Sequence, residues 1–140
     1  FISISNMPKQ LPRGLRNNNP LNIRIGCTWL GERDNPTDPD FEEFISMEYG
    51  LRAAFIILRR YIRRYKKDTV PAIIRTWAPE TENKTQRYID IVCSMSGIPH
   101  DAQINYADKV TMCKLVAAMA YVENGQNIEM SKIEKGYDWA

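Results

Sequence analysis

The sequence predicts a mainly α (α+β) fold: a single domain spanning residues 1–140 with one small β-hairpin region. Three observations lead to this fold class. Apolar residues recur at helical spacing from residue 48 onward, capping and stop residues separate these stretches, and only two short segments alternate like strands. A chain of 140 residues can bury a hydrophobic core without the help of metal ions or disulfide bonds.

The N-terminal part of the chain is rich in turn-forming residues. Prolines, Gly14 and three consecutive asparagines predict that residues 1–20 form no helix, with residues 1–12 as an irregular arm. Residues 21–25 and 41–45 flank a stretch rich in Pro, Gly and Asp. These two segments are predicted to pair as a small hairpin-like sheet.

A long amphipathic helix is predicted from Glu48 onward. Its apolar residues, which recur at steps of three and four, are Leu51, Ala54, Phe55, Leu58, Ile62 and Tyr65. Its other face contains seven cations and no acid: Arg52, Arg59, Arg60, Arg63, Arg64, Lys66 and Lys67.

Three further helices follow. Thr69 is a suitable cap for a helix that has Pro71 in its first turn and runs to Trp77. Asn83 and Gln86 resemble a capping box for a second helix, which Gly97 ends. A third, strongly apolar helix begins at Ala107 or Asp108 and ends at Asn124 and Gly125.

The composition excludes several chemistries. One histidine, His100, and three cysteines stand too far apart for a zinc site, so we expect no metal and no cofactor. A Ser–His–Asp triad or a Cys–His dyad would have to use His100, which follows Pro99 in an expected loop. The cysteines are expected to be packed free thiols. No apolar run approaches the roughly 20 residues of a membrane span.

Glu123 is the carboxylate that departs from the usual pattern. It follows Met112, Val116 and Met119 at steps of four and three, so it continues the apolar stripe of the last helix. Apolar surroundings and the negative end of the helix dipole are both expected to raise its pKa, as a general acid requires. The alternative is that the helix frays here and Glu123 points into water.

The segment around this residue resembles a known catalytic helix. VAAMAYVENG is similar to the apolar helix of lytic transglycosylases and goose-type lysozymes that ends in Glu-Ser-Gly, and Asn124 replaces the usual Ser. Upstream, TQRYI resembles the Glu-Thr-Arg-x-Tyr-Val helix of these families. Lys84 and Gln86 occupy the positions of the family's Glu and Arg, and Glu82 is the candidate to replace that Glu. Trp77 stands near the place of a substrate-contacting Tyr.

The order of these motifs differs from that of the linear families, in which the Glu helix comes first. RNNNPLNIR, Trp29-Leu30-Gly31 and Phe41-Glu42-Glu43-Phe44 resemble a region that follows the catalytic helix in peptidoglycan glucosaminidases. A circular permutation that moves the catalytic helix to the C-terminus accounts for both halves. In this order the motifs resemble phage and prophage peptidoglycan-degrading proteins of the structural-protein-P5 type, over roughly residues 13–126.

The resemblance implies a lysozyme-like fold and a lytic transglycosylase that cleaves the β-1,4 bond between N-acetylmuramic acid and N-acetylglucosamine. Glu123 would be the catalytic acid and base. The expected partners are peptidoglycan strands and other virion proteins, either on the virion or at the bacterial wall and periplasm. The predicted substrate-binding residues are Asn18, Asn19, Asn22, Trp77, Glu82, Tyr88 and Asn124. For several of these residues a purely structural role in turns or the core is the alternative.

Other functions remain open at this stage. A hydrolysing muramidase or glucosaminidase would more often need a second carboxylate, for which the candidates are Glu43, Glu42, Glu82 and Glu80. The basic helix over residues 52–67 is the basis of a nucleic-acid-binding alternative, which a total charge of only +2 disfavours. A non-enzymatic virion or wall-binding module is the third alternative, because a fold can persist without its chemistry.

Overall fold

The computed structural model describes residues 10–79 and 81–140, apart from the side chain of Glu82. Over these residues the chain is mainly helical, as predicted. The helices are α1 (Arg13–Arg16), α2 (Met47–Arg63), α3 (Val70–Trp77), α4 (Glu82–Ser96), α5 (Lys109–Asn124) and α6 (Met130–Trp139). Residues 1–9 of the predicted arm lie outside the described part of the chain, and residues 10–12 have no regular structure.

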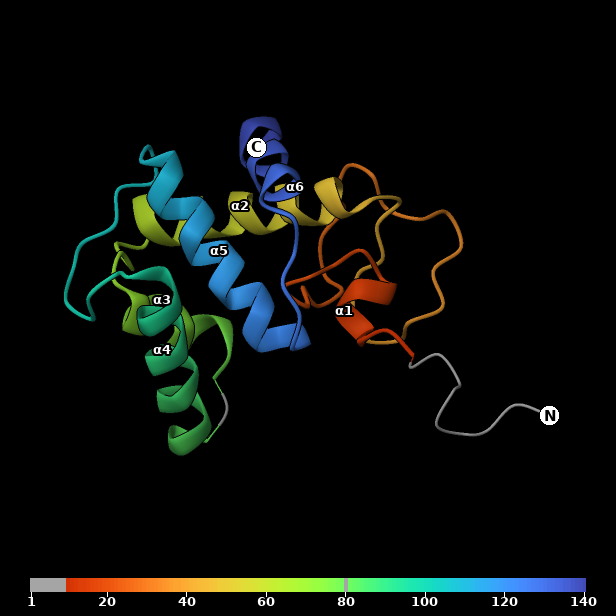
Figure 1. The fold of residues 1–140 in the computed structure, drawn as a ribbon. Helices are drawn as coiled ribbons and strands as arrows, with labels where there is room; N and C mark the ends of the chain where they lie inside the picture. Colours follow the sequence, from red (N-terminus) through yellow and green to blue (C-terminus); the bar gives the residue numbers. More distant parts are fainter. Residues whose placement is uncertain (1–9, 80) are drawn as a thin grey trace.

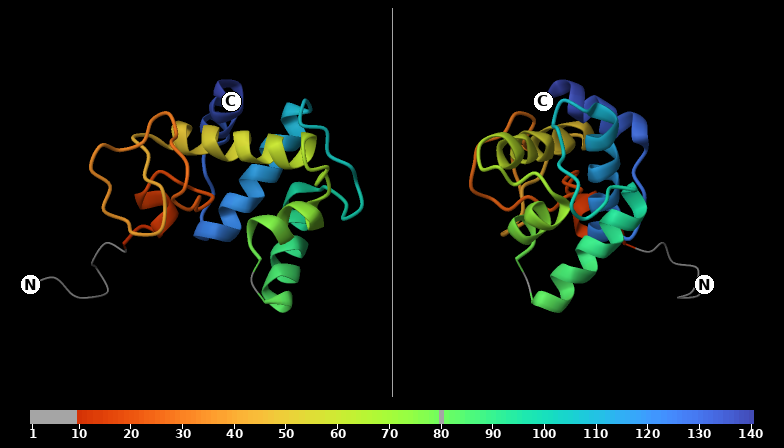
Figure 2. Two further views of the ribbon diagram at one scale, coloured as in Figure 1. Left: turned by 180° about the vertical axis from the view of Figure 1, so that it is seen from behind. Right: turned by 90° about the vertical axis from the view of Figure 1, so that its left-hand side faces the viewer.

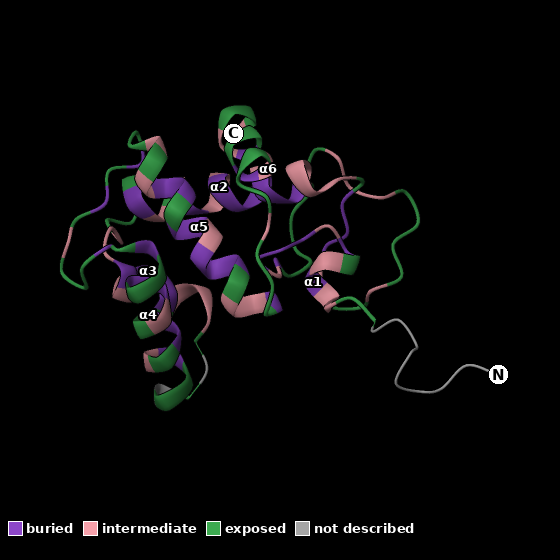
Figure 3. Ribbon diagram, in the orientation of Figure 1, coloured by how far each residue is buried: buried purple, intermediate pink, exposed green. Residues whose placement is uncertain are grey.

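Helix α5 runs through the middle of the molecule, and α2 crosses it (Figures 1 and 2). Helices α3 and α4 lie on one side of the lower end of α5, while α1 and the loop over residues 17–46 lie on the other (Figure 1). Helix α6 packs on α2 and α5. The buried core, which Figure 3 shows in purple along α2 and α5, includes Leu51, Phe55, Leu58, Met112, Leu115 and Met119.

Most of the predicted helix ends are confirmed. The Thr69 side chain accepts a hydrogen bond from the backbone N–H of Ala72 and caps α3. Asp108 caps α5 in the same way, and Gly97 and Gly125 end α4 and α5 in the left-handed conformation. These local signals were readable because each cap is made within a few residues of the chain.

Two predicted boundaries and one predicted coil are wrong. Helix α4 begins at Glu82 with Thr81 as its N-cap, so Asn83 and Gln86 are not its capping box. Helix α2 ends at Arg63, and the Tyr65 side chain is therefore 53% exposed instead of buried. Helix α1 forms inside the predicted coil because Pro12 stands before its first turn, where its carbonyl accepts the N–H groups of Leu15 and Arg16.

The predicted hairpin is reduced to isolated β-bridges in the described residues. Arg24 pairs with Phe41 in the antiparallel sense, so the two predicted segments do meet, but neither forms a strand. Asn22 has a φ of 52°, which breaks the extended conformation of the first segment. Phe44 then bridges to Glu32, and its N–H bonds to the Asn17 carbonyl, so the second segment changes partner within a few residues.

Helix α6 was not predicted from the sequence, and its packing depends on Gly136. A Cβ at this position would lie 2.5 Å from the Leu51 Cβ of α2. The absence of a side chain therefore lets α6 approach the backbone of α2 closely. Tyr137 of α6 adds an edge-to-face contact with Phe55, at 5.4 Å between ring centroids.

We predict that Gly136→Ala destabilises the protein by about 1–3 kcal/mol because the added methyl group overpacks the α2–α6 contact. In an exposed helix the same change would stabilise by up to about 1 kcal/mol. The measurement is the urea midpoint of unfolding. Gly26→Ala is the control, since a Cβ there meets no atom within 4 Å. A higher midpoint for Gly136→Ala would contradict the packing described here.

Candidate functional site

Glu123 lies in the last turn of α5, where the apolar stripe of the helix meets the surface. Met112, Val116 and Met119 are fully buried, and Glu123, the next residue of the stripe, is half-buried. The helix does not fray at this point, because it continues to Asn124 and Gly125 caps it. The side chain is also held in place: Asn22 Nδ2 donates a hydrogen bond to Glu123 Oε1 at 2.8 Å.

Three adjoining pockets form a groove on either side of Glu123. The first, of about 280 Å³, lies between α4 and the end of α5 and includes Tyr88, Ala78 and Glu123 in its lining. The second, of about 410 Å³, shares Glu123 and Ala78 with the first and extends to Trp77. The third, of about 220 Å³, shares Asn22, Arg24 and Trp77 with the second. We call this series of pockets the Glu123 groove.

Asn22 is positioned by two contacts that the residues directly before it in the chain make. Its φ of 52° is left-handed, a conformation that Asn tolerates better than most residues. The carbonyl of Leu21 accepts a hydrogen bond from Trp77 Nε1 at 3.1 Å. The carbonyl of Pro20 accepts one from Asn124 Nδ2 at 2.7 Å. These two anchors fix the backbone that presents the Asn22 amide to Glu123.

Asn18, Asn19 and Asn124 serve the fold behind the groove. Asn19 is fully buried, its Nδ2 donates to the carbonyls of Ile23 and Glu42, and its Oδ1 accepts the N–H of Ile23. It has no exposed surface with which to contact a substrate, so the predicted lining role is wrong for Asn19. Asn18 donates to the carbonyl of Phe44, and Asn124 is buried against Pro20. Neither is among the lining residues of the groove.

Tyr88 and Trp77 do lie in the groove together with Glu123 and Asn22. The Tyr88 hydroxyl donates to the carbonyl of Met119 at 3.4 Å. Burial, and secondly the neighbouring Glu123 charge, raise the pKa of the Tyr88 phenol well above its usual value. Trp77 packs edge-to-face with Tyr61 at 6.0 Å between ring centroids. The side chain of the remaining predicted residue, Glu82, lies outside the described part of the chain.

The sequence analysis did not identify several residues that line the groove. Lys84 and Arg87 line the first pocket, Phe41 the second, Tyr61 the third, and Arg24 both the second and third. One signal was available for α4, because residues 84, 87 and 91 lie on the same side of the helix as Tyr88. No comparable periodic signal exists for Arg24 and Phe41, which an irregular loop brings together.

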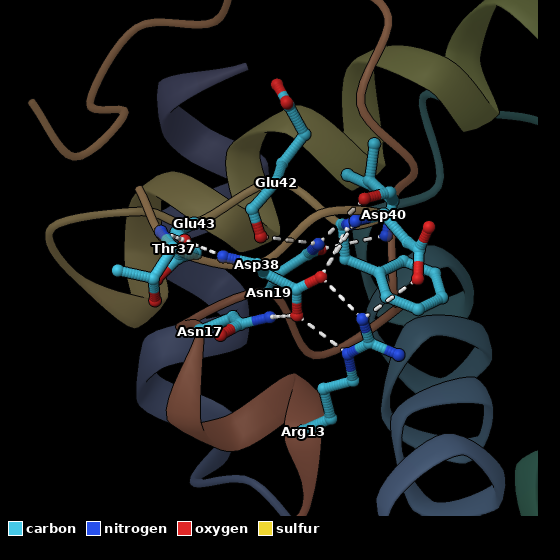
Figure 4. A network of polar contacts seen from close by, with 10 residues as sticks. Arg13, Asn17, Asn19, Thr37, Asp38, Asp40, Glu42 and Glu43 are labelled. Atoms are coloured by element: carbon cyan, nitrogen blue, oxygen red, sulfur yellow. Dashed lines mark hydrogen bonds and ion pairs between the residues drawn. The ribbon is translucent and has the colours of Figure 1, made fainter. Parts of the chain in front are cut away.

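A partly buried polar network holds that loop in shape (Figure 4). Asp38 accepts two hydrogen bonds from the Arg13 guanidinium, at 2.6 and 2.5 Å, and one from Asn17 Nδ2 at 2.8 Å. The Arg13 contact holds the pKa of Asp38 well below its usual range. Glu43 Oε2 accepts the backbone N–H groups of Thr37 and Asp38, and Glu43 Oε1 accepts from Arg33. These contacts therefore connect the loop to α1 and join distant parts of the loop to each other.

Two of the four candidates for a second catalytic carboxylate belong to this loop. Glu42 and Glu43 are both 7% exposed and line a separate pocket of about 250 Å³ with Glu32 and Cys27. Neither is among the residues that line the Glu123 groove. Glu80 and the side chain of Glu82, the other two candidates, lie outside the described residues.

Comparison with known proteins connects this architecture to a phage. The chain is 40% identical to Protein P5 of Pseudoalteromonas phage PM2 over 146 aligned residues, which span 99% of this chain and 89% of the phage protein. The chain belongs to the family of this Protein P5. No protein-family model matches it. The relationship supports the prediction of a phage-encoded protein.

The basic face of α2 has structural roles in this member of the P5 family. Arg52 Nε donates to the carbonyl of Trp139, and Arg59 Nη1 donates to that of Ala140, so both contact the C-terminal end of α6. Arg59 and Arg63 also lie over the Tyr106 ring, at 5.5 and 5.1 Å from its centroid. Part of the cationic pattern is thus explained by helix packing without any external partner.

The other residues singled out in the sequence lie away from Glu123. His100 pairs with Asp90 at 3.0 Å on the exposed side of α4. Cys93 and Cys113 are buried free thiols, and burial raises the pKa of Cys113 to about 11. Cys27 is exposed, so the expectation of packing is wrong for this thiol. The described residues contain no group of three or more His, Cys, Asp or Glu side chains suited to a metal ion. None of their helices is long and apolar enough to cross a membrane.

The buried carboxyl of Glu42 predicts a specific pH dependence of stability. Burial, and then the hydrogen bond and charge of Glu32, raise the pKa of Glu42 from 4.5 to about 7. The folded state favours the protonated form of Glu42. The resulting contribution to the free energy of unfolding is fully present below pH 4.5 and is lost as the pH rises through about 7. Glu42→Gln, whose amide can still donate to Glu32, is expected to be about 2 kcal/mol more stable than the parent at pH 8.

Urea unfolding at pH 5 and pH 8 measures this effect. The exposed Asp34→Asn change, in the same loop, is the control for removing one negative charge. Equal stability differences for the two variants at both pH values would contradict the assignment.

Proposed function

We propose that this protein is a peptidoglycan-degrading lytic transglycosylase with a circularly permuted, lysozyme-like fold. The observation that carries the proposal is the half-buried Glu123 carboxylate, held by Asn22 in the middle of an extended groove. The bond is the β-1,4 link from N-acetylmuramic acid to N-acetylglucosamine. The resemblance of VAAMAYVENG to the catalytic helix of lytic transglycosylases supports the same assignment.

Glu123 would act first as an acid and then as a base. The protonated carboxyl gives its proton to the glycosidic oxygen as the bond from the muramic acid C1 to that oxygen breaks. The resulting carboxylate then takes the proton of the 6-hydroxyl of the same sugar while O6 bonds to C1. The products are a 1,6-anhydro sugar end and a free 4-hydroxyl, and Glu123 regains its proton. No water is consumed, and one carboxylate performs both steps.

The described lining of the groove is consistent with this single-carboxylate chemistry. Glu123 is the only acid among the described residues that line the three pockets. Hydrolysis by a carboxylate pair would require a second acid at about 5–9.5 Å. Glu42 and Glu43 line another pocket, which favours transglycosylation over the alternative of a hydrolysing muramidase or glucosaminidase.

The phage relative is consistent with where such an enzyme would act. A phage must pass the peptidoglycan layer during entry or release. We therefore propose peptidoglycan strands as the partner and the virion, or the bacterial periplasm and wall, as the place of action, with other virion proteins as further partners.

The decisive experiment compares the parent with Glu123→Gln on purified peptidoglycan. The variant keeps the size and polarity of the side chain but has no titratable proton, so we expect cleavage to fall by about 10²–10⁴-fold. Mass analysis of the released fragments is the measurement, and 1,6-anhydro ends are the expected product. Glu134→Gln, an exposed position on α6, is the matched control.

Two outcomes would contradict the proposal. Fragments with reducing ends instead of anhydro ends would show hydrolysis. Full activity of Glu123→Gln would exclude this carboxylate as the acid.

A second variant tests the role of the Asn22 amide. Asn22→Gly removes the hydrogen bond to Glu123 and still permits the left-handed backbone. Because that donor stabilises the ionised carboxylate, its loss is expected to raise the pKa of Glu123 and so to move the alkaline limb of the pH–rate profile, where the acid loses its proton, to higher pH. Loss of the fixed side-chain position is expected to slow cleavage about tenfold. The measurement is the rate from pH 4 to pH 9, with circular dichroism to confirm folding. A slower rate with an unchanged profile would mean that Asn22 only supports the loop.

A further inference from the structure

The Glu123 groove is cationic at both ends. Lys84 and Arg87 line the first pocket, on one side of Glu123. Arg24 lines the second and third pockets, on the other side. Apart from Glu123 in the middle, the described lining residues carry no negative charge. The described lining of the groove therefore holds three cations and one carboxylate, in a protein whose total charge is only +2.

The cations beyond Glu123 are held by aromatic rings. The Arg24 guanidinium lies 5.0 Å from the centroid of Phe41, which also lines the second pocket. In the third pocket, Tyr61 packs against Trp77, and Lys67 Nζ lies 5.9 Å from the Tyr61 ring centroid. The basic segment that follows α2 thus adjoins the aromatic end of the groove. Stacking limits the freedom of these side chains, so less entropy is lost when they bind a ligand.

The cations and aromatic rings of the Glu123 groove match the chemical groups of a peptidoglycan strand. The sugar rings of a glycan strand are neutral and suit the Trp77 and Tyr61 rings. In peptidoglycan the peptide stems carry carboxylates, and where a stem is absent the lactyl group carries one carboxylate in its place. Cations on both sides of the cleavage point match carboxylates on successive disaccharides. A groove for a neutral glycan would have no use for them.

We propose that the Glu123 groove selects strands by their carboxylates, so that peptide-substituted peptidoglycan binds well and neutral N-acetylglucosamine polymers bind poorly. This inference rests on the proposed function, because it assigns the substrate preference of the same site. Arg24 and Arg87 are the recognition residues on the two sides of Glu123.

Binding to the Glu123→Gln variant tests the preference without cleavage of the ligand. Titration calorimetry would use three probes: soluble glycan strands with peptide stems, the same strands after an amidase has removed the stems, and the neutral hexamer of N-acetylglucosamine. We expect affinity to fall in that order, and added salt to weaken the first probe most. Arg24→Gln and Arg87→Gln, each added to Glu123→Gln, are expected to lower affinity for the first probe by about three- to tenfold. Neither change should affect the hexamer.

Arg75→Gln is the matched control, since Arg75 is exposed on α3 and is not among the lining residues of the groove. Equal affinity for the peptide-bearing strands and the hexamer would overturn the inference. So would Arg24→Gln and Arg87→Gln variants that bind like Arg75→Gln. If either result accompanies cleavage that depends on Glu123, the proposed function stands and only the charge preference fails. If no probe binds and peptidoglycan is not cleaved, the proposed function fails with it.

Discussion

The position of the Glu123 groove depends on one contact between two segments that lie far apart in the chain. Asn124 Nδ2 donates to the carbonyl of Pro20 across 104 residues, and the same amide nitrogen bonds to the Ala120 carbonyl of its own helix. The contact needs close approach: a Cβ on Gly14 would lie only 2.5 Å from Asn124 Oδ1. Because both partners are buried, loss of this hydrogen bond would leave a desolvated carbonyl as well as a loose helix end. This contact therefore fixes the segment after α1 on the last turn of α5.

The geometry of the groove follows from that attachment. Once Pro20 is held, Leu21 and Asn22 lie beside Trp77 and Glu123, and Asn22 can donate to the carboxylate 101 residues away. The Arg13–Asp38 pair then holds the following loop, so that Phe41 returns to the groove beside Arg24. The loop has almost no sheet to support it, and partly buried charge-assisted hydrogen bonds stabilise it instead. The position of this wall of the groove therefore depends on the polar network around Asp38.

The elements that sequence analysis identified are those with local causes. Helix caps such as Thr69 and Asp108, and stop residues such as Gly125, act within one turn, so their meaning does not depend on the tertiary structure. The stripe that ends at Glu123 was readable for the same reason. The prediction that Asn19 lines the groove failed because the local sequence does not distinguish an exposed asparagine from one that stabilises a buried turn. Arg24 was missed because its neighbour Phe41 becomes a neighbour only after the loop has closed.

The long separation between Glu123 and Asn22 also bears on the proposed circular permutation, because a site built across the chain does not depend on the order of its motifs. What the chemistry needs is a carboxylate at a helix end, an amide opposite it and a groove that continues on both sides. The order in which the chain supplies these parts does not matter once they are packed. Helix α1 and the loop after it pack on α5 although they are far from it in sequence, so no short connection in the chain holds them together. The buried Asn124–Pro20 hydrogen bond joins these two segments instead. Asn124 stands where the resembling families have Ser, and its longer side chain reaches both Pro20 and Ala120, so this departure from the pattern belongs to the docking contact.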